Sequence, residues 1–349
     1  MPSLVAGLAP GTASGRIRIA PAERYVLVLV DGLGWSNLYN DLSKAPVMSA
    51  MSAQRLTVPM PSSTATSLTS LSTGVDTTSH GVVGFSFRTR PGVVLNTMAW
   101  DDPLSPPEAV QPVPTWFEKC DFPCAAVVPQ VFFGSGLTRA YLRGADLIGV
   151  AREKDWEART RQVVETAAEY ALTFVYERSL DHIAHLKGWR SSSWRRTLAD
   201  IDHFIGTLLT SLPPGTGVFV TGDHGLVDVP KTHRVFIEDE PSLAEGVTLI
   251  GGEGRLRQIY TDDPEATSAR WSQWLGSRGQ VRQRADALEW FGETAPTQDV
   301  LNRIGDVVVA LNQDWAVLTM QRPGEAGLIG MHGSLSQAER IVPLLKGES

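Results

Sequence analysis

Short runs of consecutive apolar residues alternate along this chain with stretches in which apolar residues recur at helical spacing. The apolar runs are YVLVLV (25–30), CAAVV (124–128), LTFVY (172–176) and GVFVT (217–221), and the longest helical stretches cover about 152–170 and 192–211. Unbroken apolar runs are typical of strands buried on both faces, and their alternation with helices is typical of parallel sheets. The pattern predicts an α/β fold, a three-layer α/β/α sandwich with a mostly parallel central sheet.

The alternation weakens after Asp223. Residues 231–325 contain more turn residues and shorter apolar runs, which are VTLI, LRQIY, DVVVAL and WAVLTM. Such runs indicate small antiparallel strands. We therefore expect one catalytic domain over residues 1–349, with residues 231–325 inserted into it as a small lid.

Composition narrows the classes of function. The chain has 349 residues, 42% of them hydrophobic, and a formal net charge of −7. An acidic chain without a cluster of Lys and Arg is a poor binder of a nucleic-acid backbone. No apolar run reaches the length of a membrane span, and the N-terminal residues do not follow the pattern of a signal peptide. We expect a cytoplasmic protein that contacts neither nucleic acid nor membrane, and two thiols (Cys120 and Cys124) in or near the core.

Two predicted strands end in an aspartate followed by glycine. Asp31 and Gly32 follow the first strand, and Asp223, His224 and Gly225 follow the run GVFVT. Ligands of open α/β sheets gather beyond the carboxyl ends of the strands, where these side chains are expected. Asp-Gly is also a common turn pair, so each motif alone has a structural explanation.

Three further residues suit metal binding. Asp181 and His185 are spaced i, i+4, which places both on one face of a helical turn, while His182 points elsewhere. His332 lies between glycines in GMHG. Taken singly, the pair also fits a helix surface, and a lone histidine is more often structural.

A run of hydroxyl residues, PSSTATS (61–67), precedes an apolar helix that is expected to run to Gly74. A hydroxyl at a helix N-terminus faces free N–H groups, which favour a phosphate. Ser and Thr are equally the preferred N-caps. Spacing within the run does not distinguish Ser62, Ser63, Thr64 and Thr66.

Together these residues satisfy a two-metal site. Two catalytic ions about 4 Å apart need roughly three protein ligands each. Asp181, His185 and His332 supply one set. Asp31, Asp223 and His224, with the Thr64 oxygen, supply the other. The mixed nitrogen and oxygen donors suit Zn²⁺, with Mn²⁺ as the alternative.

The order of these motifs resembles the alkaline phosphatase superfamily, and most closely its type I phosphodiesterase/nucleotide pyrophosphatase family. The motifs are strand-Asp-Gly, P-S-x-T with Gly ten residues later, S-H-G, D-x-x-x-H, D-H-G and G-x-H-G, spanning residues 24–335. The resemblance implies that Thr64 is the nucleophile, that Asp31, Asp223 and His224 bind the ion that activates it, and that Asp181, His185 and His332 bind the ion that serves the leaving group. The family usually has Asn three residues after the nucleophile, where it contacts a phosphoryl oxygen. Ser67 occupies that position here.

The implied reaction is hydrolysis through a phosphothreonine intermediate on a small phosphorylated substrate, with nucleotides among the candidates. No Lys or Arg occurs between Arg55 and Arg88, so no basic residue flanks Thr64. This favours a diester or pyrophosphate over a monoester dianion, unless a cation of the insert such as Arg255 or Arg257 folds in. The alternatives are a phosphonoacetate-hydrolase-like C–P hydrolase, a phosphomonoesterase and a non-catalytic zinc- or phosphate-binding relative. Aromatic residues that fit either a nucleobase site or a core are Phe85, Trp271, Trp274 and Trp290.

Overall fold

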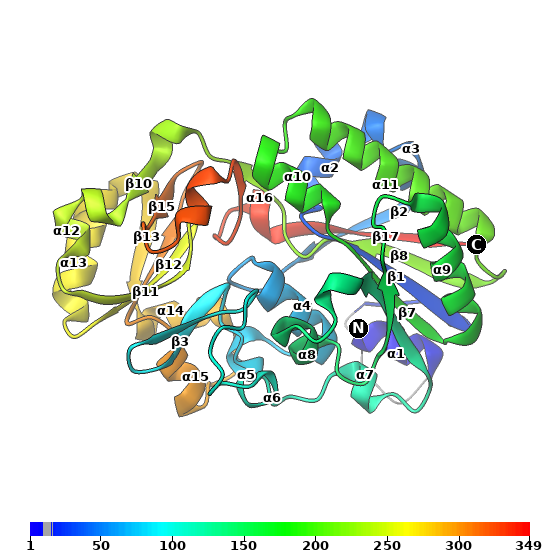
Figure 1. Cartoon of the computed structure of the whole chain (residues 1–349), viewed down its shortest axis with the longest axis horizontal. Helices are drawn as coiled ribbons and strands as arrows, with labels where there is room; N and C mark the ends of the chain where they lie inside the picture. The colour runs from blue at the N-terminus through cyan, green and yellow to red at the C-terminus, as the bar shows by residue number, and fades with distance from the viewer. Residues whose placement is uncertain (10–14, 16) are drawn as a thin grey trace.

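The chain folds into two lobes that lie side by side, each built on its own sheet (Figure 1). A computed structural model describes residues 1–9, 15 and 17–349. Residues 10–14 and 16, part of the stretch searched for a signal peptide, lie outside the described residues. The larger lobe contains both ends of the chain (Figure 1).

The larger lobe contains a seven-stranded sheet. Its strands in spatial order are β2 (Ser52–Thr57), β17 (Ile341–Glu348), β8 (Thr216–Thr221), β1 (Arg24–Val30), β7 (Leu172–Glu177), β5 (Cys124–Pro129) and β6 (Asp146–Val150). The five strands from β8 to β6 are parallel, and β17 is antiparallel to both of its neighbours. The predicted mostly parallel sheet is confirmed. The two strands at the antiparallel edge were not predicted.

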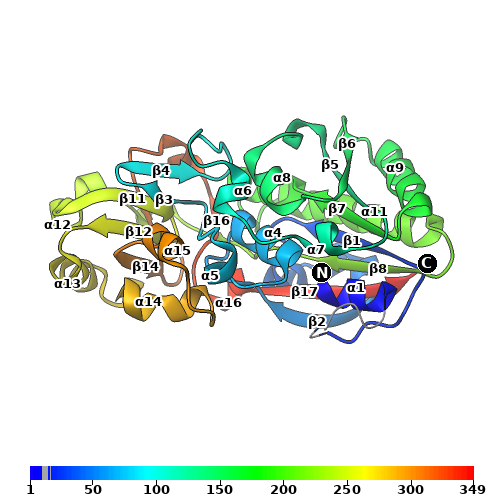
Figure 2. The same ribbon diagram turned by 90° about the horizontal axis from the view of Figure 1, so that it is seen from below.

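Helices cover both faces of this sheet, which confirms the three-layer sandwich (Figure 2). Alternate residues of β1 point to opposite faces, Val26 and Val28 to one core and Leu27 and Leu29 to the other. One face packs against α2 (Trp35–Asn40), α3 (Pro46–Ala50), α9 (Trp156–Glu169), α10 (Ser179–Lys187) and α11 (Ser192–Ser211). The other packs against α1 (Pro2–Leu8), α4 (Thr64–Thr73), α6 (Pro107–Val110), α7 (Trp116–Lys119) and α8 (Gly136–Tyr141).

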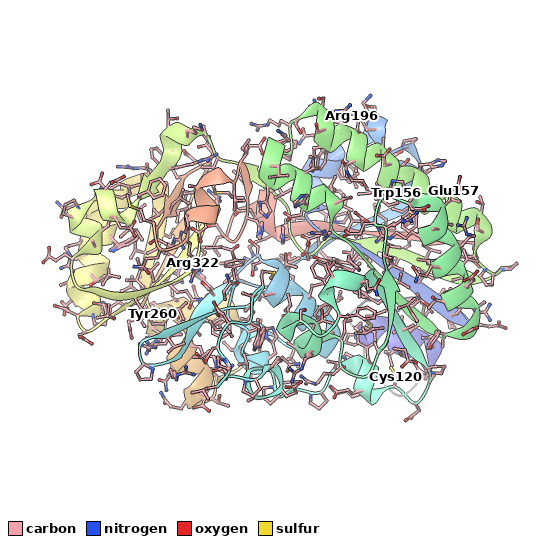
Figure 3. The ribbon with its side chains drawn as sticks, in the orientation of Figure 1. Cys120, Trp156, Glu157, Arg196, Tyr260 and Arg322 are labelled. Carbon is pink, nitrogen blue, oxygen red and sulfur yellow. The ribbon has the colours of Figure 1, made fainter. Side chains whose placement is uncertain are left out.

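The helices present polar side chains outward, as amphipathic helices on a sheet must. Glu157 on α9 and Arg196 on α11 lie on the outer surface (Figure 3), whereas Trp194 on α11 is fully buried. Among the described residues no helix combines the length and apolarity needed to cross a membrane. Cys124 is buried, Cys120 is partly buried, and both are free thiols.

The smaller lobe comes mainly from residues 231–325, which we call the insert. It contains a four-stranded antiparallel sheet ordered β11 (Val247–Glu253), β12 (Leu256–Thr261), β14 (Val307–Leu311) and β13 (Gly279–Gln283). Its helices are α12 (Pro241–Ala244), α13 (Pro264–Leu275), α14 (Arg284–Phe291) and α15 (Gln298–Arg303). The hairpin of β3 (Ser86–Arg90) and β4 (Val93–Asn96) also packs against β11.

One short strand pair joins the insert to the larger lobe, and a second lies within the insert. The strands on its two sides, β9 (Val227–Asp228) and β16 (Gly330–Met331), pair antiparallel, so the chain leaves and returns at one place. Within the insert, β10 (Arg234–Phe236) pairs with β15 (Ala316–Leu318). This second pair is parallel, so the expectation that the run WAVLTM forms an antiparallel strand was wrong. The chain then continues through α16 (Gln337–Arg340) into β17.

Candidate active site

The predicted site residues come together at the carboxyl ends of β1, β7 and β8. Asp31 directly follows β1, and Asp223 lies two residues beyond β8. Asp181 lies in the first turn of α10, which follows β7 after one residue. His332 follows β16, and Thr64 is the first residue of α4. Because parallel strands end at one edge of the sheet, residues far apart in sequence meet there.

The first cluster contains Asp31, Asp223 and His224, all of them buried. The Nε2 atom of His224 lies 3.3 Å from Oδ1 of Asp31 and 3.6 Å from Oδ2 of Asp223. The other oxygen of Asp223 accepts hydrogen bonds from the backbone N–H groups of Gly32 (3.0 Å) and His224 (3.1 Å). These bonds fix the carboxylate so that its free oxygen points at the cluster.

The second cluster contains Asp181, His185 and His332. Nε2 of His185 lies 3.0 Å from Oδ2 of Asp181, one helical turn earlier. Nδ1 of His185 donates to the carbonyl of Gly330 (2.7 Å), and Nδ1 of His332 donates to the carbonyl of Ser62 (2.9 Å). In each cluster one ligand atom from every residue lies within 4.8 Å of the others.

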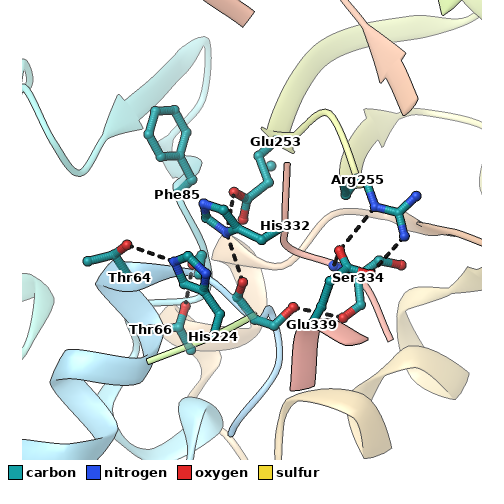
Figure 4. Close-up of polar contacts among 12 residues, drawn as sticks. Thr64, Thr66, Phe85, His224, Glu253, Arg255, His332, Ser334 and Glu339 are labelled. Carbon is teal, nitrogen blue, oxygen red and sulfur yellow. Dashed lines mark hydrogen bonds and ion pairs between the residues drawn. The ribbon is translucent and has the colours of Figure 1, made fainter. Parts of the chain in front are cut away.

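The two clusters adjoin each other. The rings of His224 and His332 stack with centroids 3.6 Å apart (Figure 4). Gly32, between the clusters, has a φ of +76°, and a Cβ atom at this position would lie 3.0 Å from the Cβ of Asp181. Glycine therefore permits both the turn after Asp31 and the close approach of α10.

Exposure distinguishes Thr64 from the neighbouring hydroxyls. Ser62, Ser63 and Thr66 are fully buried, and the hydroxyls of Ser62 and Thr66 donate to backbone carbonyls. Thr64 is only partly buried, and its Oγ1 lies 3.2 Å from Nε2 of His224 (Figure 4). The N-cap residue Ser63 makes no side-chain cap hydrogen bond. Capping therefore does not explain the hydroxyl run, and Thr64 is the hydroxyl presented to the clusters.

Ser67, the predicted substrate contact, lies one turn further along α4. It is buried, and its Oγ has no hydrogen-bond partner. It lines a mostly apolar cavity of about 240 Å³ beside Thr221, Gly222 and Asp223. Its contact with a phosphoryl oxygen remains a prediction.

Burial and like charges raise the pKa of two of the carboxylates. Burial, with the charge of Asp181, raises the pKa of Asp31 to about 7. Burial, with the charge of Asp31, raises the pKa of Asp223 to about 8. Burial opposes the charged form of His185, but the charge of Asp181 outweighs it and raises the pKa of that imidazole to about 9. The arrangement favours bound positive charge, which relieves repulsion between buried carboxylates.

Sequence reasoning missed two residues that contact the clusters. The hydroxyl of Tyr176, the fifth residue of β7, donates to Oδ2 of Asp31. The carboxylate of Glu253, at the end of β11 in the insert, lies 3.5 Å from Nδ1 of His332. A tyrosine late in a buried strand is a weak signal for the first contact. No local sequence pattern indicates that Glu253 contacts the site.

The basic residues suggested as substrate-binding cations of the insert serve a different role. Arg255 and Arg257 are fully buried and pair with Glu339 and Glu325. The suggestion was wrong because both guanidinium groups are used in structural ion pairs: Arg255 joins the insert to α16, and Arg257 joins β12 to the turn at residues 323–327. Arg322, labelled in Figure 3, donates to the carbonyl of Gly252 (2.7 Å).

The aromatic residues divide between core and site. Trp271 is fully buried in the core of the insert, and Trp274 packs against the same core. Trp290 is partly buried against the large hydrophobic cluster that extends from the main sheet into the insert. Phe85 alone of the four reaches the site, where it lines a small cavity of about 70 Å³ with His185, His332 and Glu253.

An α/β sandwich that presents two carboxylate–imidazole clusters and a hydroxyl at the carboxyl edge of its sheet has the architecture of a phosphohydrolase. The model of the family described as type I phosphodiesterase/nucleotide pyrophosphatase matches residues 25–335. The chain belongs to this family.

Solved structures share the fold. Human ectonucleotide pyrophosphatase/phosphodiesterase 5 superposes with a TM-score of 0.73 at 15% identity, over 93% of this chain and 87% of that chain. The murine protein of the same name gives 0.73 at 17% identity, over 92% and 87%. A second murine structure, an inactive variant with alanine in place of threonine in complex with AMP, gives 0.72 at 17%, over 92% and 87%. No curated protein matches the chain in sequence.

Proposed function

We propose that this chain is a two-metal phosphodiesterase/nucleotide pyrophosphatase that uses Thr64 as its nucleophile. The observation that carries the proposal is the position of Thr64. It is the accessible hydroxyl of its run, it begins a helix, and its Oγ1 lies 3.2 Å from a side-chain atom of the first cluster. Metal dependence, the covalent intermediate and the preference for diester or phosphoanhydride bonds are all part of the proposal.

The donor atoms fit two divalent ions. Asp31 Oδ1, Asp181 Oδ1 and Asp223 Oδ2 are buried and have no hydrogen-bond partner. Such oxygens are costly unless a cation balances them. Nδ1 of each imidazole donates to a backbone carbonyl, that of Gly330, Ser62 or Gly225. This leaves the Nε2 lone pairs free for coordination, as in metal sites whose second ring nitrogen is hydrogen-bonded.

We assign one ion to Asp31, Asp223, His224 and Thr64, and the other to Asp181, His185 and His332. Zn²⁺ suits the mixed donors, and Mn²⁺ is the alternative. When bound, the ions supply positive charge that lowers the pKa of a hydroxyl and stabilises negative charge on phosphoryl oxygens.

The residues of the chain then perform two in-line displacements. The Oγ of Thr64 loses its proton to solvent and forms a bond to phosphorus while the bond from phosphorus to the leaving oxygen breaks. The leaving group departs with that electron pair and takes up a proton. Water then attacks the phosphothreonine, the bond to Thr64 breaks, and the threonine regains its proton. The uncapped N-terminus of α4 places backbone N–H groups and the positive end of the helix dipole beside the phosphoryl group.

The related structures support the choice of residue and substrate class. A murine family member with alanine in place of threonine is described as inactive and as binding AMP. We transfer both features to this chain as part of the proposal, with Thr64 in the role of the threonine and a nucleotide as the substrate. The buried ion pairs of Arg255 and Arg257 leave neither guanidinium for a monoester dianion, which favours the diester.

The proposal is tested by metal analysis and turnover of bis-(p-nitrophenyl) phosphate. We expect about two zinc ions per chain, with activity that is lost in Thr64→Ala and retained in part in Thr64→Ser. Thr66→Val is the matched control, because it removes a buried hydroxyl two residues away that lies outside the clusters. A panel of nucleotide diesters, p-nitrophenyl phosphate and phosphonoacetate assigns the bond that is cleaved. Unchanged activity in Thr64→Ala refutes the nucleophile assignment, and metal binding without turnover of any of these compounds favours a binding protein.

A further inference from the structure

Glu253 is the residue of the insert whose side chain reaches the metal-ligand clusters. It is the last residue of β11, at the turn into β12, and Figure 4 shows it beside His332. Its Oε2 lies 3.5 Å from Nδ1 of His332, and its Oε1 is buried without a hydrogen-bond partner. A carboxylate oxygen is costly to bury unless a nearby donor or cation compensates it.

The backbone around His332 is shaped to admit this carboxylate. Gly333 has a φ of +122°, and a Cβ atom at this position would lie 2.7 Å from Cγ and 2.9 Å from Oε1 of Glu253. No other residue type fits that gap without moving the glutamate. The contact therefore depends on a glycine next to the histidine that Glu253 approaches.

A second contact anchors the same hairpin. Arg255, two residues after Glu253, makes a buried bidentate ion pair with Glu339 (3.0 and 2.7 Å). Glu339 also accepts a hydrogen bond from the backbone N–H of Ser334 (3.0 Å), and the carbonyl of Ser334 accepts one from the hydroxyl of Ser62 (2.8 Å). The segment 332–334 is thus held between the loop before α4, which contains Ser62, and the turn of the hairpin (Figure 4).

We propose that Glu253 is a positioning residue of the metal centre, which orients the His332 ring through Nδ1 and couples metal binding to docking of the insert. Nδ1–H already points to the carbonyl of Ser62 at 2.9 Å. The Glu253 carboxylate adds a longer electrostatic contact to the same nitrogen (3.5 Å), so that Nε2 is held facing the cluster. A carboxylate behind a ligand imidazole also increases its basicity. The inference rests on the two-metal function proposed above.

The test measures zinc affinity directly, by chelator competition on metal-free protein. We expect Glu253→Ala to raise the Kd of one of the two ions by about 10- to 100-fold, the range for residues that hold a metal-binding histidine in place. Glu253→Gln keeps an acceptor oxygen and is expected to remain within a few-fold of wild type. Asp286→Asn is the control, an exposed carboxylate of the insert that lies away from the clusters. Its Kd is expected to stay near the wild-type value.

Amide hydrogen exchange measures the coupling. We expect metal to increase protection of the hairpin formed by β11 and β12 in wild type and to increase it less in Glu253→Ala. Wild-type zinc affinity and wild-type protection in Glu253→Ala overturn the inference. A loss of zinc affinity in both Glu253→Gln and Asp286→Asn that equals the loss in Glu253→Ala also overturns it. Failure of the wild-type chain to bind two ions instead overturns the proposed function, so the two failures are distinguishable.

Discussion

Removing one carboxylate of the first cluster should stabilise the metal-free protein. Oδ1 of Asp223 accepts two backbone hydrogen bonds, whereas Oδ2 has no partner and lies 3.6 Å from Nε2 of His224. Asparagine keeps the Oδ1 acceptor and places an NH₂ group where the unpartnered oxygen was. Asp223→Asn therefore removes a buried charge next to Asp31 without removing the hydrogen bonds that hold the side chain.

The raised pKa of Asp223 gives the size and sign of the expected change in stability. Burial, with the charge of Asp31, raises the pKa of Asp223 from 3.8 to about 8. A group with a raised folded-state pKa stabilises the fold at low pH, and this stability is lost as pH rises through the folded value. Four pKa units correspond to at most ~6 kcal/mol. Because water and local relaxation screen part of this energy, we expect Asp223→Asn to gain roughly 2–4 kcal/mol at pH 8.

Urea unfolding at pH 5 and pH 8, with EDTA or with zinc, measures this effect. We expect the metal-free wild type to lose stability between the two pH values and Asp223→Asn to lose less. Zinc should stabilise wild type, by about 2.7 kcal/mol at 100 times Kd, and the variant much less. Asp286→Asn, an exposed carboxylate of α14, is the control. If metal-free Asp223→Asn is no more stable than wild type at pH 8, the electrostatic reasoning is wrong.

Two further variants examine contacts beneath the site. Tyr176→Phe removes the hydroxyl that donates to Asp31, and we expect zinc affinity to fall about tenfold with little loss of stability; unchanged affinity in the chelator assay would contradict this. Arg159 and Glu177 form a buried ion pair between α9 and the end of β7, so Arg159→Met should lower the free energy of unfolding by ~3–5 kcal/mol because it leaves a buried charge unpaired. Adding Glu177→Gln should recover part of that loss in urea unfolding, and failure to recover any of it would show that the pair is not the cause.

The parts of the site that sequence reasoning located are those with local signals. Asp31 follows an apolar run, and Asp181 and His185 share a helical face, so the strand pattern and the helical period indicate where each side chain points. The parallel sheet then brings them together, because its strands end at one edge. The main sheet was predicted for the same reason.

Other features depend on contacts between distant segments. The two antiparallel strands β2 and β17 pair across almost the whole chain. Tyr176 reaches Asp31 because it lies opposite Leu29 in the register of β7 and β1. The choice of Thr64 depends on which hydroxyls become buried, a tertiary property that its run of similar residues cannot encode.

The segment that returns from the insert combines several of these distant contacts. The carbonyl of Gly330 accepts a hydrogen bond from His185, and Nδ1 of His332 donates one to the carbonyl of Ser62 in the loop before α4. The backbone N–H of Ser334 donates to Glu339, which is the ion-pair partner of Arg255. Five consecutive residues thus contact α10, the loop before α4, the insert and α16. An ion bound by His332 would therefore stabilise the junction of the two lobes, and zinc removal should loosen the insert before it unfolds the main sheet.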